Sequence, residues 1–134
     1  GSHTQPPVLY NNHFYVQYST NERKDGLVCM SMDGQVKWKT MRNPLFEKGG
    51  IILADGLLLA TDGRSTLYLI QPDPAGFKPL ASSDLFNKTP SGSQGNNPAL
   101  KVGASAQNWA PIALADGKLL IRDQNRLMCV KVVK

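Results

Sequence analysis

Few side chains of this chain are of the types that perform covalent catalysis or bind metals. Nucleophilic catalysis needs a base beside the nucleophile, and beyond the first three residues the only histidine is His13, at the start of a predicted strand. Neither Cys29 nor Cys129 belongs to a CxxC motif, so a cysteine–histidine metal site is effectively excluded. The glycines of 92–95 are not followed by the lysine and helix of a phosphate-binding loop.

The carboxylates are spaced as turn residues and not as catalytic pairs or metal ligands. The chain has 10 Asp and Glu residues, and five of the aspartates directly precede a glycine: Asp25, Asp33, Asp55, Asp62 and Asp116. An aspartate at such a position hydrogen-bonds to its own backbone and supports the turn. We therefore expect local structural roles for these aspartates and no metal-ligand cluster.

Composition and charge exclude several classes of protein. The 134 residues are 41% apolar and 19% charged, which predicts one folded domain. The net charge of +5 is scattered along the chain, whereas a nucleic-acid interface would need clustered bases with interleaved aromatic residues. No uncharged apolar run approaches the roughly 20 residues of a membrane span. Residues 1–3 resemble the remnant of a purification tag, and we expect residues 4–134 to be part of a longer protein.

A threefold internal repeat supplies the elements that would position any site. The segments Leu27–Met30, Leu67–Ile70 and Leu127–Val130 occupy one column of the repeat, and Leu53–Gly56 matches Leu114–Gly117. Asn-Asn and Asp-Gly dipeptides, which favour two-residue hairpin turns, separate short apolar runs of strand length. Each unit therefore reads as three strands joined by turns.

Further strands are predicted at 35–40 and 77–82, after the first two units. A period of about 40 residues with four strands is the sequence signature of a β-propeller blade. We therefore predict an all-β fold: a partial β-propeller of about three four-stranded antiparallel blades. The blades span about 6–42, 49–86 and 108–134, and the last lacks its fourth strand.

Two further expectations follow from the repeat. Residues 87–108 are rich in proline, glycine, serine and asparagine, and we expect a long polar loop there between the second and third blades. Cys29 and Cys129 fall at the same position of the first and third blades, so they lie too far apart for the roughly 7 Å Cα separation of a disulfide. We expect two buried free thiols.

The first unit resembles the repeat of the pyrroloquinoline-quinone-type (PQQ-like) β-propellers. In that family a strand is followed by a glycine turn and then by a tryptophan, as in Leu27–Ser31, Gly34 and Trp38. The resemblance implies that Trp38 packs against the neighbouring blade and holds the two blades together. The second unit has Gly76 and Phe77 in place of the glycine and tryptophan. The third unit, Asn108–Val130, resembles the last blade of many bacterial members.

The same resemblance places three candidate binding residues, Trp109, Arg122 and Asp123, at strand ends, where propellers usually bind ligands. An arginine beside a tryptophan can bind anionic or aromatic groups. The structural alternative is that Arg122 pairs with Asp123 or a loop carbonyl, while Trp109 fills a gap between blades. Both interpretations remain open at this stage.

The resemblance implies a non-catalytic binding or assembly scaffold in a periplasmic or secreted bacterial protein, with no cofactor and a protein or glycan as partner. One alternative is the C-terminal part of a quinoprotein-type oxidoreductase, which would use PQQ with calcium and hold its active residues mostly outside this chain. A second alternative is a fragment that assembles into a closed ring. Propellers have about 4–8 blades, so we expect association with a second copy or with the missing N-terminal part.

Overall fold

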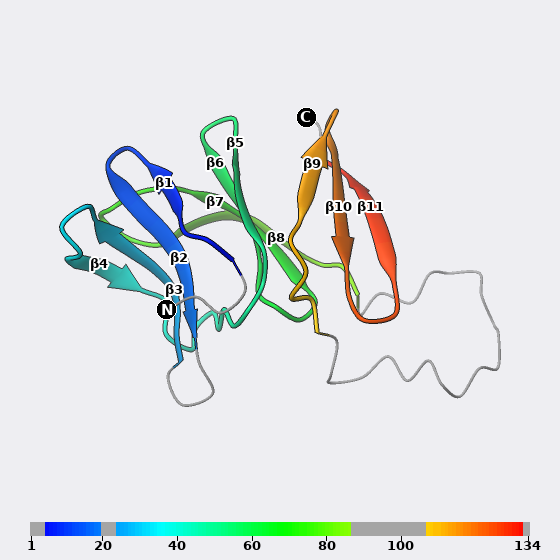
Figure 1. Ribbon diagram of the computed structural model, residues 1–134, viewed down its shortest axis with the longest axis horizontal. Coiled ribbons are helices and arrows are strands. Elements are labelled where there is room, and N and C mark those ends of the chain that lie inside the picture. Colours follow the sequence, from blue (N-terminus) through cyan, green and yellow to red (C-terminus); the bar gives the residue numbers. More distant parts are fainter. Residues whose placement is uncertain (1–4, 20–23, 87–106, 133–134) are drawn as a thin grey trace.

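The computed structural model describes residues 5–19, 24–86 and 107–132, which form eleven strands in three antiparallel sheets and no helix (Figure 1). The prediction of an all-β fold is confirmed. The three sheets lie side by side, with the second between the first and the third, and they do not close into a ring. Residues 1–3 and most of the expected loop 87–108 lie outside the described residues.

The sheets follow the repeat in chain order. The first sheet has the order β1 (Val8–Tyr10), β2 (His13–Ser19), β3 (Lys24–Ser31) and β4 (Val36–Lys39). The second has the order β5 (Ile51–Ala54), β6 (Leu57–Thr61), β7 (Thr66–Gln71) and β8 (Lys78–Asp84). The third contains β9 (Ala113–Ala115), β10 (Lys118–Arg122) and β11 (Leu127–Lys131). The strands predicted at 35–40 and 77–82 correspond to β4 and β8.

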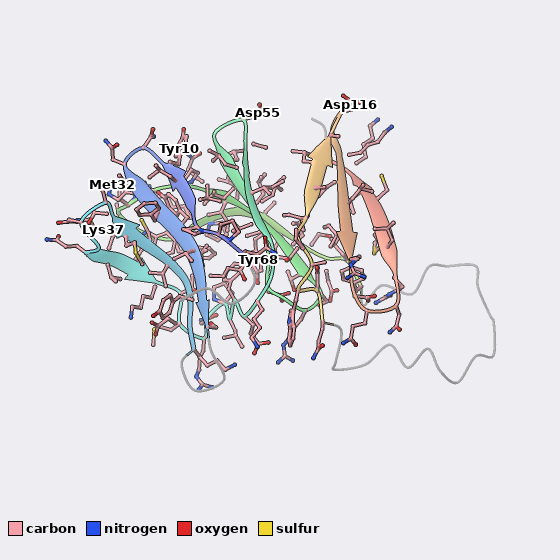
Figure 2. All side chains as sticks on the ribbon, viewed as in Figure 1. Tyr10, Met32, Lys37, Asp55, Tyr68 and Asp116 are labelled. Atoms are coloured by element: carbon pink, nitrogen blue, oxygen red, sulfur yellow. The ribbon has the colours of Figure 1, made fainter. Side chains whose placement is uncertain are left out.

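The predicted turn dipeptides form the hairpins. Asn11 and Asn12 join β1 to β2 with φ angles of 47° and 59°, and Asp55 joins β5 to β6 with a φ of 49°. Asp116 takes the same φ of 49° between β9 and β10. Positive φ at both central residues gives a turn whose twist matches that of the flanking strands. Figure 2 shows Asp55 and Asp116 at the tips of neighbouring hairpins at one end of the molecule.

The sheets stack face to face through two apolar cores. Alternate side chains of a strand point to opposite faces, and β6 uses both. Leu58 and Ala60 enter the core shared with the first sheet, whereas Leu59 enters the core shared with the third. The second sheet is therefore covered on both faces, while the outer sheets are each covered on one.

The uncovered faces of the outer sheets are also apolar. Leu9, Phe14, Met30 and Val36 lie side by side across the four strands of the first sheet, and Leu9 and Val36 are 50% and 48% exposed. On the third sheet, Leu120 lies between Ala113 and Cys129 and is 44% exposed. Both ends of the stack thus present a hydrophobic sheet surface to solvent.

One expectation about the cysteines is wrong. Both thiols are free, but only Cys29 is buried, whereas Cys129 is exposed. The two residues occupy the same repeat position and point to the same side of their sheets. Cys29 packs into the core shared with the second sheet, but no described sheet faces Cys129.

Candidate functional site

The structure brings the three candidate binding residues together. Trp109, Arg122 and Asp123 line a cavity of about 140 Å³ with Gln107, Ala110 and Gln124. The cavity lies between the segment that leads into β9 and the turn that joins β10 to β11. Its polar groups are two amides and one exposed guanidinium, that of Arg122, so it can accept a small polar or anionic group.

Asp123 is held by the turn that it stabilises. Its Oδ1 accepts hydrogen bonds from the backbone N–H groups of Asn125 (2.8 Å) and Arg126 (2.6 Å), and its Oδ2 pairs with the Arg126 guanidinium at 2.9 Å. Asp62 makes the same turn contacts in the second sheet, to the N–H groups of Arg64 and Thr66. The carboxylate of Asp123 is therefore occupied by its own turn.

The suggested pairing of Arg122 with Asp123 is wrong, because Asp123 pairs with Arg126 instead. Consecutive side chains at the end of a strand point to opposite sides, so Asp123 is buried while Arg122 is exposed. Arg126 also donates to the backbone oxygen of Phe86 at 2.8 Å and stacks 4.9 Å from that ring. Arg126, which the sequence did not single out, fixes this end of the third sheet against the segment after β8.

Asp123 gives a pH-dependent test of this arrangement. Burial opposes ionisation of the carboxyl, but hydrogen bonds from Asn125 and Arg126 outweigh burial and hold its pKa below the ordinary value. A depressed native pKa stabilises the fold above the unfolded-state pKa, and this contribution is lost as the pH falls through the native pKa. We expect Asp123→Asn to lower the free energy of unfolding by about 1–2 kcal/mol at pH 7. Urea unfolding at a series of pH values should show the difference shrinking below about pH 4. A difference that stays constant down to pH 3 would contradict this role.

Trp109 is held by a lysine from the neighbouring sheet. The Lys48 ammonium nitrogen lies 4.6 Å from the centroid of the indole ring, within the range of a cation–π interaction. Lys48 belongs to the segment before β5, so this contact joins the second and third units. Trp109 therefore contributes to packing between the sheets while one side of it lines the cavity.

Asn108 adds a buried polar group directly before Trp109. It is 0% exposed, and neither its Oδ1 nor its Nδ2 has a hydrogen-bond partner. Its backbone N–H donates to the oxygen of Gly63 at 3.0 Å. Burying an unpaired amide costs about 1–3 kcal/mol, so a polar group or water that reached Asn108 would be bound favourably.

The sequence did not reveal Gln17, which joins the first sheet to the second. Its Oε1 accepts from the backbone N–H of Gly49 at 2.9 Å, and its Nε2 donates to the oxygens of Thr61 (2.8 Å) and Gly50 (3.3 Å). Counted from the first hairpin turn of each unit, Gln17 occupies the position of Thr61 and Arg122. The only sequence signal was this alignment, which gives Arg122 the position from which Gln17 reaches the next sheet.

The described residues do not fit the calcium and PQQ of a quinoprotein. Calcium needs six to eight oxygen ligands, and within 5–19, 24–86 and 107–132 no group of three or more His, Cys, Asp or Glu residues could hold a metal ion. The most buried carboxylates are already paired with cations: Asp25 with Lys39, Glu47 with Lys24 and Arg64, and Asp123 with Arg126. In the same ranges, no helix is long and apolar enough to cross a membrane.

No family model matches the chain, and no curated protein matches its sequence. Its function is therefore inferred from the geometry of the sheets and of the cavities between them.

Proposed function

We propose that this chain is a non-catalytic scaffold: consecutive blades of a β-propeller that is completed by a second copy or by further blades of a longer protein. One repeat position carries the proposal. Leu27 and Leu67 are 0% and 7% exposed because each packs against the next sheet, whereas the equivalent Leu127 is 70% exposed. The third sheet thus has the residues of an inner blade without a neighbour to cover them.

The opposite end of the stack supports the same proposal. The row from Leu9 to Val36 is an apolar face on the first sheet, and the second sheet shows how such faces are covered, by another sheet of the same kind. Burying apolar surface yields about 25 cal/mol per Å², and exposed apolar patches of several hundred Å² mark interaction sites in soluble proteins. Two uncovered faces, one at each end, suit closure into a ring, with three sheets from each of two copies as the simplest case.

The resemblance to PQQ-like repeats supports a bacterial periplasmic or secreted setting and a protein or glycan as the final ligand. A scaffold of this kind would use its assembled ring for binding, with the cavity at Trp109 and Arg122 on its surface. The described residues offer no paired acid and base for catalysis, in agreement with a binding role.

Light scattering on a size-exclusion column tests the proposal. We expect the chain to form a discrete dimer or higher oligomer and Leu120→Lys to convert it to a folded monomer, because the lysine places a charge in the uncovered face. Leu80→Lys is the matched control, since Leu80 is 57% exposed on the edge strand β8 but belongs to neither end face. Wild type and Leu120→Lys running as folded monomers of the same mass at all concentrations would contradict the proposal.

A further inference from the structure

A large apolar cavity of about 760 Å³ lies between the second and third sheets. Leu67, Leu69 and Ala81 line it on the second sheet, and Leu114 and Val132 line it on the third. It opens toward β8, which is mostly exposed, because the third sheet has no fourth strand among the described residues to lie opposite β8. The volume is within the range of pockets that bind drug-sized ligands.

The equivalent space between the first and second sheets is filled by two aromatic side chains. Trp38 lies opposite Cys29 in the first sheet, and its ring centroid is 6.0 Å from that of Phe77, at the start of β8. In the second sheet, Ala81 lies opposite Leu69, the counterpart of Cys29, so an alanine stands where the first sheet has Trp38. The counterpart of Phe77 would belong to a fourth strand of the third sheet.

The backbone of β11 is open on the side where that strand would pair. The N–H of Val132 donates to the oxygen of Gly117 at 2.7 Å, on the β10 side. Because hydrogen-bonding groups alternate along a strand, the N–H and C=O groups of Leu127, Cys129 and Lys131 point to the opposite edge.

The first sheet shows that this edge is the one that receives a strand. The oxygen of Leu27, the counterpart of Leu127, accepts a hydrogen bond at 2.9 Å from the N–H of Thr40, directly after β4. No described residue pairs with the corresponding edge of β11. An exposed row of unpaired backbone groups is a template for strand addition.

The charges at this edge favour an acidic partner. Lys118 and Lys131 lie directly opposite each other on β10 and β11, and both are exposed. Like charges at opposite positions of a sheet destabilise it, and no described carboxylate lies within ion-pair distance of either lysine. A carboxylate on an added strand beside Lys131 would relieve the repulsion.

We infer that the outer edge of β11 and the adjoining cavity bind an extended, acidic segment of a partner polypeptide. The segment adds as a fourth strand antiparallel to β11, places one aromatic side chain in the cavity beside Val132, and sets a carboxylate against Lys131. The pairing of β8 with β7 is the template, because Lys78 lies opposite Gln71, the counterpart of Lys131, and Phe77 precedes it. This strand-addition site goes beyond the proposed scaffold function, since it uses the edge of the third sheet and not its uncovered face.

The test uses the full chain and a fluorescent peptide with the sequence of residues 76–84 carrying Lys78→Glu. We expect saturable binding by fluorescence anisotropy, and at least about tenfold weaker binding of the same peptide with Phe77→Ala, which leaves the cavity empty. Repeating the titration with the Leu120→Lys chain keeps the result separate from self-association, so failure of ring closure and failure of strand binding are distinguishable.

Two chain variants test the edge itself. Cys129→Pro removes an N–H that β10 does not use, so we expect a folded chain with at least about tenfold weaker binding, whereas Cys129→Ala should bind like wild type. Lys131→Glu should weaken binding of the acidic peptide and strengthen binding of the unaltered Lys78 peptide, an exchange that a misfolded variant would not produce. Absence of binding to the Leu120→Lys chain, or equal binding by Cys129→Pro with no charge exchange, would overturn the inference.

Discussion

Replacing Gly49 with alanine is expected to abolish stable folding, or to lower the free energy of unfolding by more than about 4 kcal/mol. A Cβ atom at Gly49 would lie 2.0 Å from the oxygen of Thr61 and 2.6 Å from the nitrogen of Gly63. Both are backbone atoms of the second sheet and its following turn, so neither can move without separating the strands. The same shift would break the hydrogen bond from the Gly49 N–H to Gln17.

Gly76→Ala is the matched control. A Cβ at Gly76 would meet no atom within 4 Å, so we expect a change within about 0.5 kcal/mol. Urea unfolding followed by far-ultraviolet circular dichroism measures both variants. If the two alanine variants unfolded at the same urea concentration, the close contact at Gly49 would be disproved.

The strands were predictable because their signals are local. Asn11 and Asn12 favour positive φ wherever they occur, as do Asp55 and Asp116, and short apolar runs flank them on both sides. The repeated column of leucines then gave the number of sheets and the absence of a fourth strand after β11. None of these features depends on contacts between distant residues.

The contacts between sheets were not predictable in the same way. Gln17 is a single polar residue in a strand, and its role appears only when Gly49 and Thr61 are brought to it. Gly49 itself lies in a Gly-Gly pair that reads as an ordinary loop. The close approach that excludes a side chain there is set by the end of β6 and the turn after it.

The candidate site was predictable in position but not in pairing. Repeat alignment placed Trp109, Arg122 and Asp123 at neighbouring strand ends, and all three line one cavity. The partner of Asp123 depended on the path of the β10–β11 turn, which folds Arg126 back onto the carboxylate. Exposure of Cys129 depended on whether a further sheet covers its face, which a repeat cannot report about its own last unit.

Trp38→Ala should lower the free energy of unfolding by about 3–5 kcal/mol, the range for removing a large aromatic side chain from a core. The indole packs between Tyr15 of its own sheet and Phe77 of the second, with ring centroids 6.1 and 6.0 Å away. Its Nε1–H donates to the backbone oxygen of Asp73 at 2.7 Å. The variant therefore opens a cavity between the two sheets and leaves a carbonyl without its donor.

Trp38→Phe separates the two contributions. It keeps most of the apolar volume but loses the hydrogen bond to Asp73, so we expect a loss of about 1–2 kcal/mol by urea unfolding. Trp109→Phe is the matched control, because no hydrogen bond of its indole accompanies the contact with Lys48, and we expect less than about 1 kcal/mol. If Trp38→Ala were no more destabilising than Trp109→Phe, Trp38 would not hold the first sheet against the second. The comparison between the filled first interface and the open second one would then lose its basis.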